Sequence, residues 1–115
     1  MENRMMQSML LDFYGELLTE RQRSCYDLHV NEDLSLSEIA EQIGVSRQGV
    51  WDNIRRAEQT LREIEEKTGL VRRFTGIRRS LATIGRQAAD IEKLSDGEAQ
   101  RLAREIRREL QRLEE

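Results

Sequence analysis

Apolar residues recur at every third or fourth position along almost the whole chain, whereas the alternation typical of β-strands is nowhere sustained. Such spacing places one apolar stripe on each helix and leaves its other sides polar. The 115 residues include no proline, and only 4% of them are aromatic. We therefore predict an all-α fold, with one small domain and a helical extension.

Two helices are predicted before residue 32. The first spans residues 5–17, and the second begins after Thr19 and ends near Asn31. Thr19 and Gln22 have the spacing of a capping box, in which each side chain accepts a hydrogen bond from the other residue's backbone amide. The expected core residues are Met6, Met9, Leu10, Phe13 and Leu17 in the first helix, and Cys25, Tyr26 and Leu28 in the second.

The segment Leu34–Arg56 predicts a helix-turn-helix. A second capping box, Ser35 with Glu38, starts a short helix that ends at Gly44, and Ser46 then caps a longer helix. This packing exposes the start of the longer helix, where the major groove of a DNA duplex could receive it. The apolar residues expected to lock the two helices together are Ile39, Ala40, Ile43, Val45, Val50 and Ile54.

Apolar residues at coiled-coil spacing follow in three seams. The first lies on the helix capped by Ser46, which is expected to extend beyond the globular part as far as Gly69. The second starts directly after Gly69 in a different register, and a third capping box, Ser95 with Glu98, starts the last helix. The seam residues are Val50, Ile54, Ala57, Leu61 and Ile64, then Leu70, Phe74, Ile77, Leu81, Ile84, Ala88 and Ile91, and finally Ala99, Ala103, Ile106, Leu110 and Leu113.

We divide the chain into a helix-turn-helix domain, residues 1–68, and a C-terminal helical hairpin, residues 69–115. A hairpin of this size buries little apolar surface by itself. Its seams therefore predict packing against the helix-turn-helix domain, against a second copy of the chain, or against both, and we favour a homodimer. Packing of three helices within one chain, with no partner, is the alternative.

The exposed face of the predicted recognition helix carries side chains that can contact nucleic acid. Arg47 can donate to a guanine edge and Gln48 can bond an adenine edge, while Ser37 can donate to phosphate from a helix N-terminus. Asp52 on the same face would repel phosphate, and Trp51 is either an exposed contact residue or folded against the second helix. The alternative is that the serines only cap their helices and that Arg47 and Arg55 only solvate this face. The predicted contact residues are Ser46, Arg47, Gln48, Trp51, Asn53, Arg55 and Arg56.

A second candidate surface consists of arginines on the last two helices. Arginine suits phosphate because its guanidinium group can donate two parallel hydrogen bonds, so this surface could bind RNA. The alternative is an ordinary solvated face with ion pairs, such as Arg101 with Glu105 one helical turn away. The candidate phosphate contacts, which have no acidic neighbours in the sequence, are Arg72, Arg73, Arg78 and Arg79.

The net charge of −3 divides unevenly along the chain. Residues 1–70 carry 8 basic and 14 acidic residues, whereas residues 71–115 carry 11 basic and 8 acidic residues. DNA-binding domains usually present a basic surface to the duplex. The acidic balance of the helix-turn-helix half therefore counts against tight DNA binding by this half alone.

The sequence also excludes several classes of protein. It has no apolar run of about eighteen residues that would predict a membrane span, and its N-terminus lacks the pattern of a signal peptide. A single cysteine, Cys25, fits a reducing cytosol, so we expect a cytoplasmic protein. Cys25 and His29 are four residues apart, but two ligands do not make a metal site. We find no catalytic residue set and expect no enzymatic activity, no cofactor and no metal.

Five stretches carry a family resemblance, namely Asp12–Tyr14, Leu17–Gln22, Leu34–Glu41, Val45–Val50 and Asp52–Ile54. They resemble region four of bacterial sigma factors and, more closely, the YlxM family. The resemblance covers about residues 8–67, with Gly49 and Trp51 standing where the family usually has alanine and tyrosine. YlxM proteins are small bacterial proteins encoded next to the signal recognition particle GTPases. Membership implies a regulatory part in that pathway and implies no enzymatic activity.

Two functional hypotheses follow. In the first, the protein is a dimeric helix-turn-helix regulator tied to the signal recognition particle pathway, and it binds nucleic acid through residues 46–56. In the second, it is an accessory protein that keeps the fold but binds the RNA or a protein of the particle through the arginines of its C-terminal helices. The intact motif favours the first hypothesis, and the acidic balance of residues 1–70 favours the second.

Overall fold

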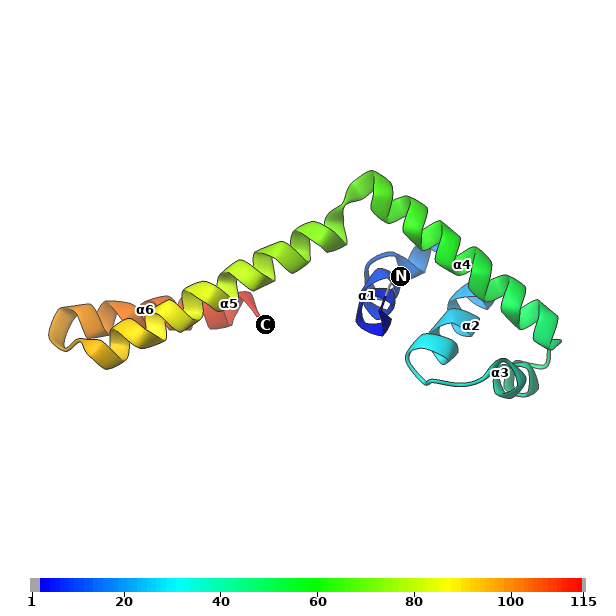
Figure 1. Cartoon of the computed structure of the whole chain (residues 1–115), viewed down its shortest axis with the longest axis horizontal. Helices are drawn as coiled ribbons and strands as arrows, with labels where there is room; N and C mark the ends of the chain where they lie inside the picture. The colour runs from blue at the N-terminus through cyan, green and yellow to red at the C-terminus, as the bar shows by residue number, and fades with distance from the viewer. Residues whose placement is uncertain (1–2, 115) are drawn as a thin grey trace. The chain divides into compact units, whose positions relative to one another are not determined.

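The computed structural model describes residues 3–114, and Figure 1 shows its helices. No strand occurs in this range, so the predicted all-α fold is confirmed. The chain divides into two compact units, one ending at Val71 and the other starting at Arg72. The elements are α1 (Arg4–Tyr14), a 3-10 turn η1 (Gly15–Leu17), α2 (Glu20–Val30), α3 (Leu36–Ile43), α4 (Arg47–Thr68), α5 (Leu70–Leu94) and α6 (Gly97–Leu113).

The first unit is built around α4, which packs against α1, α2 and α3. The apolar stripe of α4, Val50 to Leu61, is buried among residues of the other three helices. The expectation that this helix extends beyond the globular part with a free seam is therefore wrong. The seam is already covered within the chain, because three helices pack along it. The largest fully buried side chains of the unit are Tyr26, Leu10, Ile39, Leu61, Val50 and Val71.

Helix α1 ends earlier than the predicted residue 17. It stops at Tyr14, and the 3-10 turn that follows winds more tightly, so the residues after it change sides. Phe13 and Leu17, both expected in the core, are 40% and 67% exposed, whereas Leu11 and Tyr14 are buried. The tighter turn after Tyr14 explains the exposure of Leu17, since the i, i+3, i+4 stripe holds only while the helix stays α. Phe13 still lies within α1, and it is exposed because the buried side of this helix runs through Leu10, Leu11 and Tyr14.

The predicted caps and helix ends are confirmed at four places. Both capping boxes, at Thr19 and at Ser35, show the reciprocal pair of hydrogen bonds. Gly44 and Gly69 end α3 and α4 with φ values of +82° and +64°. Glycine adopts this left-handed conformation without the steric cost that a Cβ atom brings.

A polar network joins α1 to the end of α4. The Tyr14 hydroxyl donates to Glu65 Oε1 at 2.7 Å and lies 2.5 Å from the Thr68 hydroxyl. The same carboxylate oxygen of Glu65 accepts from the Val71 backbone N–H at 3.1 Å. Burial is the main reason that the pKa of Tyr14 is raised, and the Glu65 carboxylate raises it further. The network therefore fixes the first turn of α5 within the first unit.

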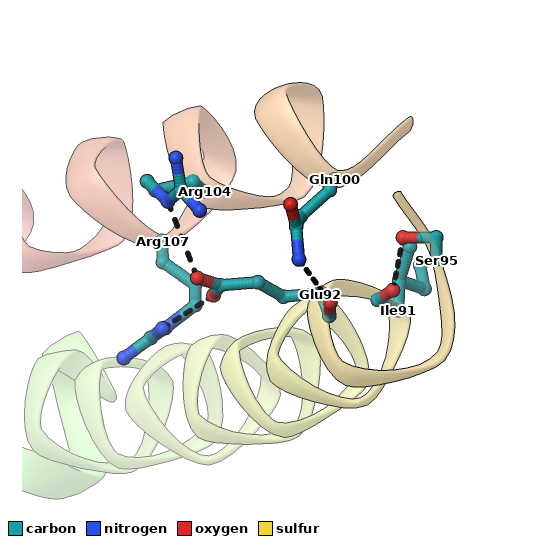
Figure 2. Close-up of polar contacts among 6 residues, drawn as sticks. All are labelled: Ile91, Glu92, Ser95, Gln100, Arg104 and Arg107. Carbon is teal, nitrogen blue, oxygen red and sulfur yellow. Dashed lines mark hydrogen bonds and ion pairs between the residues drawn. The ribbon is translucent and has the colours of Figure 1, made fainter. Parts of the chain in front are cut away.

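The second unit is an antiparallel pair formed by α5 and α6 (Figure 1). The two helices approach closely at small residues, since Ala88 and Ala103 are buried and a Cβ on Gly85 would lie 3.6 Å from Leu110. Figure 2 shows the polar contacts between them, which centre on Glu92. Its carboxylate accepts from Arg104 at 3.3 Å and from Arg107 at 2.5 Å, and its backbone carbonyl accepts from Gln100 at 3.1 Å.

The predicted capping box at the start of α6 is wrong. The Ser95 hydroxyl donates back to the Ile91 carbonyl of α5 instead of accepting from Glu98, as Figure 2 shows. Asp96 is the N-cap residue and makes no side-chain capping bond. Glu98 pairs with Arg101 of its own helix. Ser95 is close enough to the last carbonyls of α5 to satisfy one of them, and this bond competes with the cap.

Within residues 3–114, no helix is both long enough and apolar enough to cross a membrane.

Removing the Tyr14 hydroxyl should weaken the first unit. Tyr14→Phe takes one hydrogen-bond partner from Glu65 and one from Thr68 in a partly buried place, and we expect the free energy of unfolding to fall by about 1–2 kcal/mol. Urea denaturation followed by circular dichroism measures the change. Glu66→Gln, a charge change on an exposed neighbour, should alter the free energy of unfolding by less than about 0.5 kcal/mol. Equal effects of both variants would contradict a structural role for this hydroxyl.

The Glu92 contacts predict a dependence on pH. The Arg107 side chain, followed by Arg104, lowers the pKa of the Glu92 carboxyl below its usual value of 4.5. A lowered pKa in the folded state stabilises the fold above pH 4.5, and this stabilisation is lost as the pH falls through the lowered pKa. Glu92→Gln should therefore lower the melting temperature at pH 7, and this difference from the unaltered protein at the same pH should shrink as the pH falls below 4.5. A pH-independent difference in melting temperature would refute the ion-pair interpretation.

Candidate nucleic-acid interface

A three-residue turn joins α3 to α4. Gly44 N–H and Val45 N–H both donate to the Ala40 carbonyl, at 2.9 and 3.2 Å. The Ser46 hydroxyl then accepts from the Gly49 N–H at 3.0 Å and caps α4. The turn therefore places the first residues of α4 beside α3, in the manner of a helix-turn-helix.

The two sides of α4 differ in the way the sequence predicted. Val50 and Ile54 are buried, whereas Arg47 and Gln48 are exposed. Trp51 is 41% exposed, and the guanidinium carbon of Arg55 lies 4.8 Å from the centre of its ring. At this distance the arginine and the ring attract each other, which holds both side chains along the surface of α4.

An open groove lies between the N-terminal ends of α3 and α4. It has a volume of about 690 Å³, and Ser37, predicted as a phosphate contact, lies in it together with three residues predicted for the recognition helix. The free amides at a helix N-terminus carry a positive partial charge, and Arg47 adds a full one. The residues that line the groove are Ser35, Leu36, Ser37, Arg47, Gln48 and Trp51.

Sequence reasoning did not assign Ser35 or Leu36 to this surface. The signal was present, since the Ser35–Glu38 capping box marks the N-terminus of α3. In this box the Ser35 hydroxyl accepts from Glu38 N–H at 3.1 Å, and Glu38 Oε1 accepts from Ser35 N–H at 3.0 Å. The bonds from Ser35 lower the pKa of the Glu38 carboxyl, its backbone N–H first and its side chain second. Ser35 therefore caps α3, and Ser37 does not.

Several of the predicted contact residues already have partners along α4. Gln48 Nε2 donates to Asp52 Oδ1 at 3.2 Å, so this amide must leave Asp52 before it can bond a base. Asn53 Nδ2 donates to the Gly49 carbonyl at 2.8 Å and is half-buried. Neither Asn53 nor Arg56 lines the groove, although Arg56 is exposed.

The predicted phosphate contacts on α5 lie in a basic stretch. Residues 70–89 contain five arginines and no acidic residue, and all five are exposed. Arg78 lies with its guanidinium carbon 5.6 Å from the Phe74 ring centre. Arg72, Arg79 and Arg86 follow at intervals of seven residues, which places them on one side of the helix. Arg73 and Arg78 lie roughly 100° to either side of this row, so the stretch puts positive charge on several sides of α5.

Glutamates bind four of the arginines of α6. Arg101 pairs with Glu98 and, at 2.5 Å, with Glu105, as the sequence suggested. Arg112 pairs with Glu109 at 3.0 Å, while Arg104 and Arg107 hold Glu92 of α5. The ion-paired interpretation therefore describes α6.

Cys25 and His29 serve the fold of the first unit. Cys25 is fully buried, and burial raises the pKa of its thiol. His29 Nδ1 lies 3.2 Å from the Leu34 carbonyl and is half-buried. Across residues 3–114, no cluster of three or more histidine, cysteine or acidic side chains is arranged to hold a metal ion.

Comparison with known proteins identifies the family of this fold. The profile of family UPF0122, whose description reads "Putative helix-turn-helix protein, YlxM / p13 like", matches residues 1–101. The chain belongs to the UPF0122 family. The resemblance to YlxM noted in the sequence is thereby confirmed, and the matched range runs from the first unit into α6.

Individual UPF0122 proteins are similar over different lengths. The UPF0122 protein of Acetivibrio thermocellus is 57% identical over 67 residues, a segment that spans 58% of this chain and 57% of that protein. The UPF0122 protein of Thermoanaerobacter sp. is 42% identical over 107 residues, which cover 92% of each chain. A UPF0122 protein of Bacillus cereus is 45% identical over 87 residues, covering 76% of this chain and 79% of that protein.

The role of Ser46 as a cap can be measured through stability. Ser46→Ala removes the acceptor for Gly49 N–H at the start of α4, and we expect the free energy of unfolding to fall by about 1 kcal/mol. Ser37→Ala, which removes a hydroxyl that lines the same groove, should change the free energy of unfolding by less than about 0.5 kcal/mol. Urea denaturation of both variants provides the measurement. The cap assignment fails if Ser37→Ala costs as much as Ser46→Ala.

Proposed function

We propose that this UPF0122 protein is a nucleic-acid-binding regulator that docks on duplex DNA through its helix-turn-helix. The observation that supports this proposal is the groove between α3 and α4, which collects Ser37, Arg47, Gln48 and Trp51 on one open surface. A recognition helix enters the major groove with its N-terminal residues toward the bases, while the preceding helix contacts the backbone. In this protein the corresponding residues are Arg47 and Gln48 for the bases and Ser37 for a phosphate.

The charge of the first unit sets the strength expected for this binding. Residues 1–70 carry a net charge of −6, which repels DNA at a distance, so the contacts at the groove must supply most of the affinity. Few phosphates are then neutralised, so the affinity should fall only gently with added salt. A plot of log affinity against log salt concentration should fall with a slope of about 0.9 for each phosphate contacted. Gln48 must also give up its hydrogen bond to Asp52 before it can bond a base. This cost disfavours DNA sequences that do not offer an adenine at that position.

A second candidate function is binding of RNA by α5. The observation that favours it is the stretch from residue 70 to residue 89, which holds five exposed arginines and no acidic residue. Arginine binds phosphate through two parallel hydrogen bonds. In this function the helix-turn-helix is a structural scaffold, and Arg72, Arg73, Arg78 and Arg79 make the contacts.

Both functions can be placed in the cytoplasmic signal recognition particle pathway. Support for this placement comes from the resemblance to YlxM, whose members are encoded next to the GTPases of that particle, and from the family description, which names YlxM. The particle contains RNA, which would be the natural ligand of the arginines on α5. In this pathway the protein acts as a regulatory or accessory component and not as an enzyme.

The DNA-binding proposal is tested with Arg47→Ala. Fluorescence anisotropy with a labelled duplex should show an affinity about 5- to 150-fold lower than that of the unaltered protein, which corresponds to the removal of one bidentate bond to a base. Arg21→Ala removes the same charge from α2, outside the groove, and should change the affinity little. Because Trp51 is the only tryptophan, its fluorescence should also change when duplex binds. An affinity that Arg47→Ala leaves unchanged would refute the proposal.

The RNA-binding candidate is tested with the double variant Arg73→Ala/Arg79→Ala. Binding of labelled signal recognition particle RNA at two salt concentrations should weaken at least about 10-fold, and the salt dependence should decrease by about 0.7–0.9 for each phosphate that the variant no longer binds. Arg101→Ala/Arg112→Ala removes two arginines that glutamates already bind, so it should have a smaller effect. Equal decreases in affinity for the two double variants would point to net charge alone and would refute a specific site on α5.

A further inference from the structure

The hairpin of α5 and α6 has one polar side and one apolar side. The polar side carries the Glu92 contacts with Gln100, Arg104 and Arg107 (Figure 2). Away from it lie six large apolar side chains that are 42–68% exposed. We call these six residues the apolar face. They are Ile77, Ile84 and Ile91 of α5 and Leu102, Ile106 and Leu113 of α6.

The contacts between the two helices show that the six residues share one side. A helix turns about 100° per residue, so Ile84 and Ile91 lie on one flank of Ala88, and Glu92 lies on the other. On α6 the corresponding flanks of Ala103 carry Ile106 on one side and Arg107 on the other. Because Glu92 binds Arg107, the polar flanks coincide, and the apolar flanks must coincide too. A hollow of about 340 Å³ lined by Ile77 and Leu113, among others, spans both helices.

The apolar face is at the upper end of the usual size for an apolar surface exposed to water. A fully exposed leucine or isoleucine residue presents roughly 180 Å², toward the lower end of the range for aromatic residues, so the exposed fractions correspond to at most about 540 Å² in one copy. The largest apolar patch of a typical monomer covers roughly 300–600 Å² and often marks a binding surface. Two such faces in contact would bury at most about 1,100 Å², close to the roughly 1,000 Å² that a specific interface needs.

The spacing of the apolar face suits a helical partner of the same kind. Ile77, Ile84 and Ile91 repeat every seven residues, and so do Ile106 and Leu113, which is the spacing by which helices pack in coiled coils and four-helix bundles. Gly85, Ala88 and Ala103 fill the seam between α5 and α6, so the larger residues are left for another pair of helices.

The charges along α6 also match a second copy better than an anionic lipid surface. Arg101 is neutralised by Glu98 and Glu105, and Arg112 by Glu109. A lipid surface selects helices whose polar border is rich in unpaired cations, whereas the balanced border on α6 lets two identical faces approach there without repulsion. The border on α5 is basic, so only the charges of α6 favour a second copy.

We propose that a second copy of this chain covers the apolar face, so that two hairpins form a four-helix bundle and each pair of chains carries two helix-turn-helix units. The bundle leaves the Glu92 side of each hairpin in solvent. It goes beyond the binding functions above, since it requires neither DNA nor RNA.

Sedimentation of the full chain at tens of micromolar tests this assignment. The unaltered protein should sediment at twice the 13.5 kDa of one chain. Ile84→Glu/Ile106→Glu should sediment as a single chain, with the dissociation constant of the dimer raised at least about 30-fold. Ala82→Glu adds one negative charge, half of that in the double variant, to an exposed position of α5 outside the apolar face and should remain a dimer. Circular dichroism should show equal helix content in all three proteins, because each substituted residue is exposed.

Four results would overturn the proposal. The first is an unaltered protein that sediments only at 13.5 kDa. The second is a double variant that stays a dimer, which would place the interface elsewhere. The third is dissociation by Ala82→Glu as well, which would indicate a general effect of charge. The fourth is a single chain that co-sediments with phosphatidylglycerol vesicles through the same isoleucines, which would assign the face to lipid.

Discussion

The burial of one stripe of α4 is the interaction on which the helix-turn-helix depends. Val50, Ile54, Ala57 and Leu61 are covered by three other helices, and each of these helices has its own buried side chains against the stripe. Removing one large residue from such a stripe leaves a cavity and costs about 2–5 kcal/mol, much of the stability of a small domain. The same stripe also fixes the rotation of α4, so it decides that Arg47 and Gln48 face outward. The packing of the core and the orientation of the candidate reading surface are therefore set by the same four residues.

The groove and the charge of the unit that carries it act in opposite directions. Two helix N-termini and Arg47 attract an anion at short range, whereas the net charge of −6 over residues 1–70 repels one at long range. Contacts along α4 further reduce the attraction of the groove for a ligand, since Gln48 is held by Asp52 and Arg55 lies over Trp51. A ligand of this surface must exchange these contacts for better ones, which favours recognition of a particular partner over general attraction to phosphate.

The features that could be predicted from the sequence are those set by interactions between residues close together along the chain. Thr19, Ser35, Gly44 and Gly69 act on residues within one helical turn, and their predicted roles were confirmed. The capping box predicted at Ser95 was wrong because its hydroxyl could make either of two local hydrogen bonds, and it donates to the Ile91 carbonyl. Helical spacing alone also could not say what covers an apolar stripe. The seams of α4 and α5 have the same heptad steps, yet Leu61 is buried within the chain and Ile84 remains exposed.

For the candidate contact residues, the sequence predicted the side of the helix but not the partners of the side chains. Their position on the outer side of α4 followed from the apolar stripe, because the two sides of a helix are complementary. The pairing of Gln48 with Asp52 and the bond from Asn53 to the Gly49 carbonyl depend on side-chain rotamers, which spacing does not specify. Ser35, Leu36 and Trp51 line the same groove. Predicting this would have required the angle between α3 and α4, which is set by tertiary packing.

The network at Tyr14 has a consequence for dividing the chain into fragments. Val71 is fully buried in the core of the first unit, and its N–H is bound by Glu65, which Tyr14 also holds. A fragment that stops at Thr68 would lack the buried Val71 side chain. It would also lack the Val71 N–H that donates to Glu65, so this side of the carboxylate would face water. The smallest piece that keeps the helix-turn-helix core complete therefore reaches Val71, so it must include the first residues of the very helix that forms the hairpin.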